Sequence, residues 1–203
     1  IHTEVVANVK SRDEIMSLMF IGLTFISAFK YYEKNDKKWL GLGMLFYLLA
    51  FLSKEYAVSL IILMPLAFYL FNDFSMSKSL SASLPYFGVM AVYMVIRLQI
   101  VAPMSEDSVN DILNNPYALA DEQQQLATKI STTLNYLKLL IFPHPLSADY
   151  SYNTIPYSDF TNLMVWVSLI VHILIIRYFF YFLKRRHVLS FAIAFYIGNL
   201  LLI

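Results

Sequence analysis

Residues 160–183 read F-T-N-L-M-V-W-V-S-L-I-V-H-I-L-I-I-R-Y-F-F-Y-F-L, and the chain continues with K-R-R-H at 184–187. An apolar run of this length matches the roughly 20 residues that an α-helix needs to cross a bilayer. A cluster of Lys and Arg directly after such a run is typical of the cytoplasmic end of a span. The stretch therefore predicts a transmembrane helix, and it decides the fold class expected for the whole chain.

Five further apolar runs support the same fold class, and they cover residues 15–29, 39–52, 56–71, 84–102 and 188–203. The chain is 59% hydrophobic and 14% charged, whereas soluble proteins have roughly 25% charged residues. We expect an all-α, polytopic helical membrane protein with about six spanning helices. We expect a serine-rich loop at 72–83. Since the sequence contains no cysteine, disulfides and thiolate metal sites are excluded.

The two ends of the sequence predict that it is an internal fragment of a longer protein. It opens at Ile1 without a methionine and stops at Ile203 inside an apolar run. We therefore expect a single transmembrane domain over residues 1–203, and no targeting signal can be judged.

One segment, residues 125–142, predicts a helix that lies on the membrane instead of crossing it. Its apolar positions recur at helical spacing on one face, and they are Leu126, Ile130, Leu134, Leu137 and Ile141. Lysines and hydroxyl side chains occupy the opposite face, a pattern typical of an interfacial amphipathic helix. We place it within an extracytoplasmic loop region, residues 103–159.

The distribution of Lys and Arg predicts which loops share a side of the membrane. Basic residues concentrate in 30–38, at Lys78 and in 184–187, which assigns these connections to the cytoplasm. Alternation then puts 1–14, 53–55 and 103–159 together on the outer side, provided that 125–142 does not cross. The stretches that carry the candidate catalytic and binding residues thus share the outer face of the membrane.

Three carboxylates are the candidates for catalysis, and they are Glu4, Asp13 and Glu14. A carboxylate at a membrane surface can act as general base toward a hydroxyl, or hold a metal or a cation. The alternative is that Asp13 and Glu14 simply complement the positive end of a helix dipole. His2 lies in the same short stretch and adds to its density of reactive groups.

Cations near the outer surface are candidates for holding a phosphate, and they are Arg12, Lys54, Arg97, Lys129 and Lys138. Charged donors of this kind suit the phosphate of a membrane-embedded lipid carrier. The alternative is ordinary contact with lipid headgroups, and Lys54 and Glu55 could also form a mutual ion pair. Arg97 is the most informative, because an arginine inside a span is costly unless it has a partner.

A rigid polar loop at 142–156 reads F-P-H-P-L-S-A-D-Y-S-Y-N-T-I-P. Its prolines shape the backbone, so we expect His144, Asp149 and Tyr150, with His2 and Glu55, to form an acceptor-binding region. The alternative is a connector anchored at the interface by tyrosines. The sequence indicates no cofactor and no metal-spacing motif, although a divalent metal ion is left open.

Three stretches together resemble the transmembrane and tetratricopeptide-repeat O-mannosyltransferases, and their residues are most similar to those of the bacterial relatives. They are I-H-T-E-V-V-A-N-V-K-S-R-D-E at 1–14, L-S-K-E at 52–55 and the loop at 142–156. The resemblance implies a GT-C type glycosyltransferase with its active site facing away from the cytoplasm, in a bacterial inner membrane. Such enzymes transfer a sugar from a polyprenyl-phosphate carrier to an acceptor hydroxyl.

The chain departs from that family in two ways. The first acidic motif of the family would precede Ile1, and a tetratricopeptide repeat would have to follow Ile203. We therefore expect that these residues alone do not catalyse transfer. The alternative function is a non-enzymatic membrane protein, either a transporter or a scaffold, but no inverted repeat of the kind transporters use is visible. Nothing in the sequence indicates a nucleic-acid partner.

Overall fold

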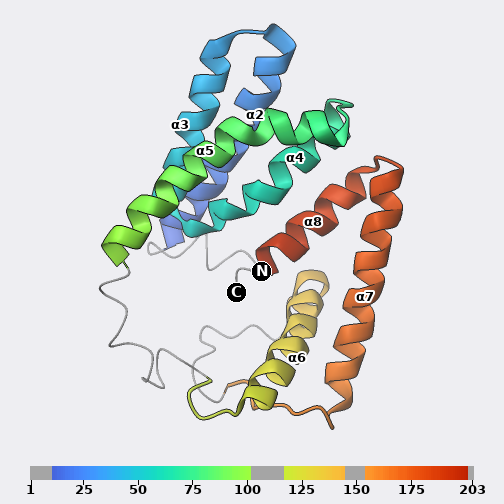
Figure 1. The fold of residues 1–203 in the computed structure, drawn as a ribbon. Coiled ribbons are helices and arrows are strands. Elements are labelled where there is room, and N and C mark those ends of the chain that lie inside the picture. Colours follow the sequence, from blue (N-terminus) through green and yellow to red (C-terminus); the bar gives the residue numbers. More distant parts are fainter. Residues whose placement is uncertain (1–10, 102–116, 145–153, 201–203) are drawn as a thin grey trace. The chain divides into compact units, whose positions relative to one another are not determined.

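The protein is all-helical in the part that the structure, a computed structural model, describes: residues 11–101, 117–144 and 154–200. No strand occurs within these ranges, which confirms the all-α part of the expected fold class. Figure 1 shows the elements, which are α2 (Arg12–Lys34), α3 (Lys37–Ser53), the 3₁₀ helix η2 (Glu55–Ser59), α4 (Leu60–Phe71), α5 (Met76–Val101), α6 (Glu122–Ile141), α7 (Leu163–Lys184) and α8 (Val188–Leu200).

Three of these helices, α2, α5 and α7, are long and apolar enough to cross a bilayer. The segments Glu55–Phe71 and Val188–Leu200 are apolar but shorter. The composition and these three helices indicate a membrane protein.

The chain divides into two compact units. The small unit comprises residues 99–177, and the large unit comprises residues 2–98 together with 178–203. The large unit contains α2–α5 and α8, and the small unit contains α6 and most of α7. Each is described separately below.

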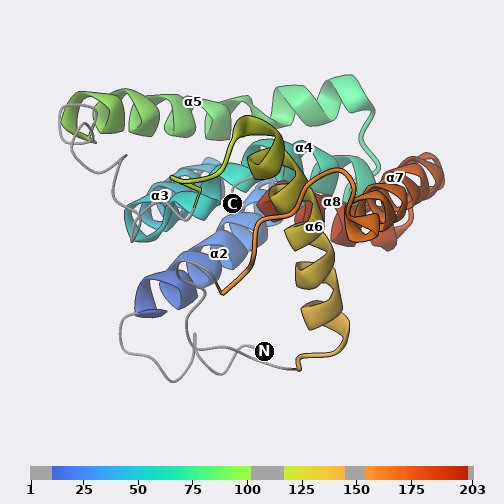
Figure 2. The ribbon, with the colours of Figure 1, turned by 90° about the horizontal axis from the view of Figure 1, so that it is seen from below.

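Aromatic side chains form the core of the large unit. Tyr47, Phe51, Phe68 and Tyr86 are almost completely buried, and rings of this size contribute most of the apolar area that a core removes from solvent. Helices α2 and α3 run side by side in both views (Figures 1 and 2). A buried hydrogen bond from the Ser17 hydroxyl to the Ala50 carbonyl, at 3.2 Å, ties the two helices together.

The serine-rich segment at 72–83 is mostly helical, so the prediction of a loop there is wrong. Helix α5 begins at Met76, eight residues before the predicted apolar run. Serine hydroxyls bond back to carbonyls four residues earlier, from Ser79 to Ser75 at 3.0 Å and from Ser83 to Ser79 at 2.8 Å. These local bonds satisfy the hydroxyls inside a helix, and hydropathy alone does not reveal them.

Helix α6 of the small unit is confirmed nearly at its predicted bounds. It begins with a capping box, in which Gln124 N donates to Asp121 Oδ1 at 2.7 Å and Asp121 N donates to Gln124 Oε1 at 3.3 Å. This reciprocal pair satisfies two backbone donors at the start of the helix.

The packing face of α6 differs from the one that its leucines suggest. Thr128 is buried and accepts a hydrogen bond from Ser158 N at 2.8 Å, and the Ser131 hydroxyl donates to the Ser158 hydroxyl at 3.4 Å. Leu126 and Ile141, on the predicted apolar face, remain exposed. Helices in membranes pack through small and hydroxyl side chains in this way, so part of the predicted polar face is the contact face.

Candidate functional site

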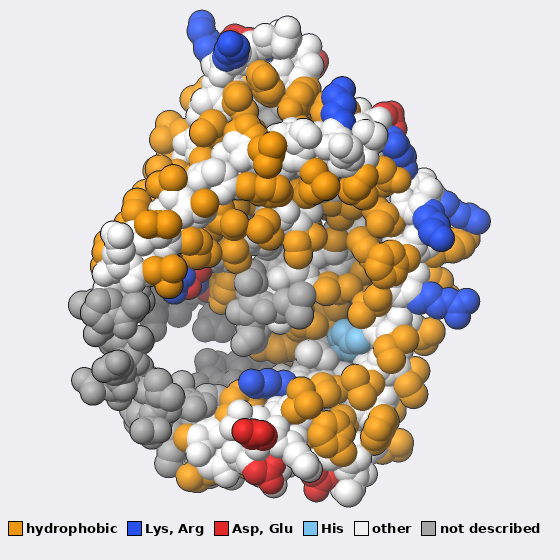
Figure 3. Space-filling model, viewed as in Figure 1, with side chains coloured by type: hydrophobic (Ala, Val, Ile, Leu, Met, Phe, Trp, Pro, Cys, Tyr) orange, Lys and Arg blue, Asp and Glu red, His pale blue; other side chains and the backbone are white. Residues whose placement is uncertain are grey.

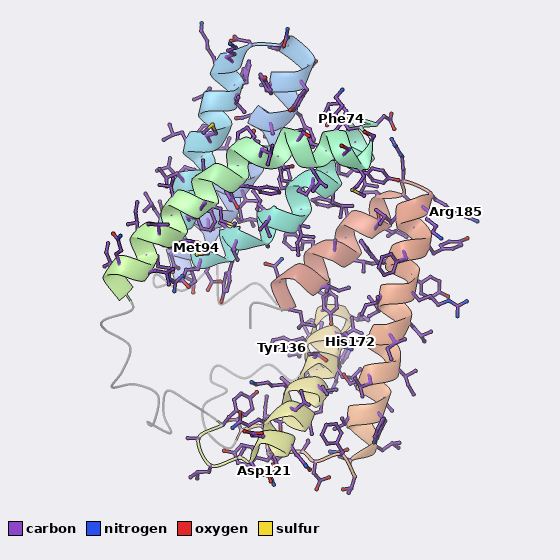
Figure 4. All side chains as sticks on the ribbon, in the orientation of Figure 1. Phe74, Met94, Asp121, Tyr136, His172 and Arg185 are labelled. Carbon is purple, nitrogen blue, oxygen red and sulfur yellow. The ribbon has the colours of Figure 1, made fainter. Side chains whose placement is uncertain are left out.

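Five of the predicted functional residues meet at one end of the large unit, where α2 begins, α3 ends and α5 approaches its end. We call this cluster the paired-ion end, and its members are Asp13, Glu14, Lys54, Glu55 and Arg97. Met94, labelled in Figure 4, lies on α5 one turn before Arg97. The sequence separates these residues by up to 84 positions, and helix packing brings them together.

The centre of the cluster is the Lys54 ammonium group. Its Nζ lies 2.9 Å from Asp13 Oδ2 and 3.5 Å from Glu14 Oε1. Both carboxylates are in the first turn of α2, where the helix dipole also favours negative charge. The hydrogen bond to Asp13 raises the pKa of Lys54. With 30% of its side chain exposed, Lys54 remains accessible to a ligand.

The neighbouring residue Glu55 pairs with a different helix. Arg97 Nη1 lies 2.5 Å from Glu55 Oε2, and 29% of the arginine side chain is exposed. The cost of placing Arg97 within an apolar helix is thereby reduced, because the guanidinium has a carboxylate partner.

The mutual Lys54–Glu55 ion pair, one of the alternatives open from the sequence, is absent. Lys54 has an extended backbone, with φ −157° and ψ 142°, where α3 ends and η2 begins. Successive side chains on extended backbone point in opposite directions. The two residues therefore reach different helices, α2 and α5, and link three helices instead of closing on each other.

A pocket of about 420 Å³ opens beside these ion pairs. Its lining is formed by Phe51, Leu52, Ser53, Lys54, Glu55, Tyr56 and Tyr93. The Phe51 and Tyr93 rings stack at 4.5 Å and form an apolar wall, while Lys54 and Glu55 supply opposite charges. A cavity that combines apolar walls with a few fixed polar groups is the usual form of a small-molecule site.

The two tyrosines of this pocket were not predicted as site residues. The Lys54 ammonium lies 5.7 Å from the centre of the Tyr56 ring, within the range of a cation–π contact. Tyr93 precedes Arg97 by four residues on α5, a spacing that puts both on one helical face. That spacing was a signal for Tyr93 available in the sequence.

The other predicted residues are not part of this cluster as described. Arg12 is exposed at the start of α2 and makes no ion pair within the described ranges. Lys138 and His144 are exposed and belong to the small unit. Four lie outside the described residues, and these are His2, Glu4, Asp149 and Tyr150.

No cofactor class emerges from the described residues. Among residues 11–101, 117–144 and 154–200, no group of three His, Cys, Asp or Glu side chains could hold a metal ion. Comparison of the chain with protein-family models, curated proteins and solved structures gives no match. A functional assignment therefore depends on the geometry of the paired-ion end and on the motif resemblance.

Proposed function

We propose that this chain is the membrane region of a GT-C type glycosyltransferase, which transfers a mannose-like sugar from a polyprenyl-phosphate carrier to an acceptor hydroxyl, on protein. The observation that carries the proposal is the position of Lys54. It joins the Asp13 carboxylate, at 2.9 Å, to the lining of a 420 Å³ pocket. A potential base and a potential phosphate ligand are thus adjacent.

The proposed reaction uses these groups in complementary roles. The acceptor oxygen attacks the anomeric carbon of the sugar, the bond from that carbon to the phosphate oxygen breaks, and the acceptor proton passes to Asp13. The carrier phosphate leaves with the bonding electron pair, and Lys54 and Arg97 stabilise its negative charge. Glu14 and Glu55 hold the two cations until a donor arrives.

The ion pairs also explain how a donor would activate the base. In the absence of donor, Asp13 shares Lys54 with Glu14, so its carboxylate is engaged. A phosphate that binds Lys54 competes with Asp13 for the ammonium protons. Asp13 is then released toward the acceptor only when the donor is present, which disfavours unproductive proton transfer.

The membrane arrangement belongs to the same proposal. About six helices span the bilayer, α6 lies in the outer interface, and the paired-ion end faces away from the cytoplasm of a bacterial inner membrane. The charge distribution of the connecting segments supports this orientation, and exposed leucines on α6 support contact with lipid. The polyprenyl tail of the donor would lie in the bilayer, with the acceptor protein outside.

The test is a transfer assay on the full-length protein with a polyprenyl-phosphate mannose donor. Asp13→Asn should lower transfer by at least about a hundredfold, as expected when a general base is lost, while donor binding is retained. Lys54→Ala and Arg97→Ala should each weaken donor binding by about tenfold or more. Glu33→Gln, an exposed carboxylate near the other end of α2, is the matched control and should leave both properties unchanged.

A purely structural role for the ion pairs makes a different prediction. In that case all three substitutions would lower expression and thermal stability together, and transfer per folded molecule would stay constant. Full transfer by Asp13→Asn at normal protein level would remove this residue from the mechanism.

A further inference from the structure

The opposite end of the large unit carries a second charged surface, formed by three turns at residues 30–38, 72–78 and 184–187. We call it the basic end. It contains eight cations, Lys30, Lys34, Lys37, Lys38, Lys78, Lys184, Arg185 and Arg186, and three carboxylates, Glu33, Asp36 and Asp73. In Figure 3, Lys and Arg side chains stand on the α2–α3 and α4–α5 turns, and Figure 4 labels Phe74 and Arg185 on this end.

Contacts between the turns make the basic end one continuous surface. The Tyr32 and Phe74 rings meet edge to face at 5.0 Å, which joins the end of α2 to the α4–α5 turn. Arg186 Nη1 donates to Asp73 Oδ1 at 2.7 Å, and its Nη2 donates to the Phe74 carbonyl at 3.2 Å. These bonds join the α7–α8 turn to the same place.

Several of the cations lie against aromatic rings. Lys30 and Lys34 both approach the Trp39 ring, at 4.4 and 5.7 Å from its centre, and Lys78 lies 3.8 Å from the Phe74 ring. Two ammonium groups at one indole repel each other. An anion bound between them would relieve that repulsion, and the indole would hold both side chains in place for it.

The carboxylates of this end pair with one of its eight cations. Asp36 Oδ1 accepts the Lys38 backbone N–H at 3.0 Å as the cap of α3, and Asp73 is bound by Arg186. Within the part of the chain that the structure describes, none of the other seven cations has a carboxylate within 4 Å. Among the described residues, these seven cations are therefore available to an added anion.

The surroundings of these cations fit a lipid surface better than a soluble acidic partner. The candidate spans α2, α5 and α7 end or begin at Lys34, Met76 and Lys184. Phe71 and Val188, at the adjoining helix ends, are about half exposed. The basic end thus presents apolar side chains first, aromatic rings next and cations last. A bilayer accommodates side chains in the same order from its hydrocarbon core to its phosphate groups.

We propose that the basic end is a binding surface for the phosphodiester headgroups of anionic phospholipids, with Lys30, Lys34 and Trp39 at its most selective point. Each Lys or Arg near an anionic membrane surface strengthens the attraction of the protein to that surface. A lysine held against an aromatic ring loses less side-chain conformational entropy on binding a headgroup than a mobile lysine does. The surface does not depend on the donor site at the other end of the unit.

The experiment uses Trp39 as the reporter. The sequence has two tryptophans, so Trp166→Phe leaves Trp39 alone. This chain is reconstituted in bilayers that contain brominated phosphatidylglycerol or brominated phosphatidylcholine, and quenching of Trp39 fluorescence gives the relative affinity for the two lipids. We expect preference for phosphatidylglycerol, and we expect Lys30→Gln with Lys34→Gln to reduce it on the order of ten- to thirtyfold.

Two controls make the result specific. Lys129→Gln with Lys138→Gln removes the same charge from the small unit and should leave the preference intact. Raising the salt concentration to about 1 M should reduce it in the unsubstituted chain, because screening shortens the reach of the cations. This second measurement requires no variant to fold.

Three outcomes would overturn the proposal. The first is equal quenching by the two lipids in the unsubstituted chain, and the second is an unchanged preference in the double lysine variant. The third is loss of the preference on adding millimolar glycerol phosphate or polyglutamate, which would assign the surface to a soluble phosphate or to an acidic protein.

Discussion

The two ends of the large unit use charge in opposite ways. At the paired-ion end, Lys54 and Arg97 each reach a carboxylate on another element, so the charges are balanced within the protein. At the basic end, Arg186 alone does so among the residues that the structure describes. Charges that are balanced across helices hold those helices together, whereas unbalanced charges are available to a partner. The same residue types therefore have different consequences according to what the fold places beside them.

The strongest test of this comparison is a substitution that disturbs both ends together. Gly43 lies on α3 between them, and a Cβ there would be 2.8 Å from the Tyr86 hydroxyl and 3.4 Å from Ser27 Cβ. We expect Gly43→Ala to destabilise the protein by about 1–3 kcal/mol, the usual cost of overpacking a core. Thermal unfolding in detergent measures this loss of stability. Because Gly43 lies between the two ends, donor binding and the lipid preference of Trp39 should both weaken in Gly43→Ala.

The matched control for this prediction is the removal of the obstructing hydroxyl. Tyr86→Phe alone should be neutral or slightly stabilising, because the buried Tyr86 hydroxyl has no hydrogen-bond partner among the described residues. In combination with Gly43→Ala it should restore most of the lost stability. Additive effects of the two substitutions would contradict the proposed contact.

The second test removes one lysine from each end. Lys54→Met leaves Asp13 and Glu14 adjacent without a cation, so we expect the melting temperature to fall by about 2–4 °C. Lys34→Met, at the basic end, removes no ion pair to a described residue and should change the melting temperature by less than about 1 °C. Equal effects at the two ends would contradict the comparison.

The contribution of Lys54 should also depend on pH in a defined direction. The hydrogen bond to Asp13 raises the pKa of Lys54 above its ordinary value of 10.5. A raised pKa in the folded state means that the stabilisation is complete below pH 10.5 and is lost as pH rises through the folded value. The melting difference between the unsubstituted chain and Lys54→Met should therefore persist up to at least that pH.

A third test exchanges the charges of the Glu55–Arg97 pair. Glu55→Arg alone puts two cations together and should lower the melting temperature by about 1–2 °C, less than Lys54→Met because Glu55 is 58% exposed. Adding Arg97→Glu should recover part of the loss. A double-mutant cycle on thermal stability measures the coupling, and an absence of coupling would remove this pair as a link between η2 and α5.

The sequence predicted the elements more completely than their contacts. Apolar runs located α2–α5, α7 and α8, because length and hydropathy determine what can cross a bilayer, and the periodicity of apolar positions located α6. They did not reveal that serines extend α5 to Met76, since those hydroxyls are satisfied by backbone carbonyls. They also assigned the hydroxyls of α6 to a solvated face, whereas the hydroxyls of Thr128 and Ser131 contact Ser158. Hydropathy ranks such residues as polar, and only packing shows that they face a neighbour.

The sequence indicated the charged residues of the paired-ion end, but neither their pairing nor the two tyrosines of the adjoining pocket. Asp13, Lys54 and Arg97 stood out because each is costly near an apolar helix unless it has a partner. The sequence does not state which carboxylate reaches which cation, because that depends on the extended backbone at Lys54. Pairing of Lys54 with Glu55 was one of the alternatives that the sequence left open, and the extended backbone at Lys54 directs the two side chains to different helices.

The Asp73–Arg186 ion pair is where we expect the smallest change in stability, and it tests whether the cations of the basic end stabilise the fold or bind a partner. Asp73 pairs with Arg186 at 2.7 Å, yet 88% of the Asp73 side chain is exposed, and exposed pairs contribute little to folding. Arg186 also donates to the Phe74 carbonyl and lies 4.5 Å from the Tyr69 ring, so it keeps two contacts when the carboxylate is lost. Asp73→Asn should therefore change the melting temperature by less than about 1 °C.

The same substitution frees one more cation of the basic end, so the preference of Trp39 for phosphatidylglycerol should rise by about fivefold, the effect of one added charge at a membrane surface. Asp13→Asn removes the carboxylate partner of Lys54 at the other end of the unit. It should therefore leave the lipid preference of Trp39 unchanged. If Asp73→Asn destabilised the protein and left the lipid preference constant, the cations of the basic end would be structural, and the difference between the two ends would disappear.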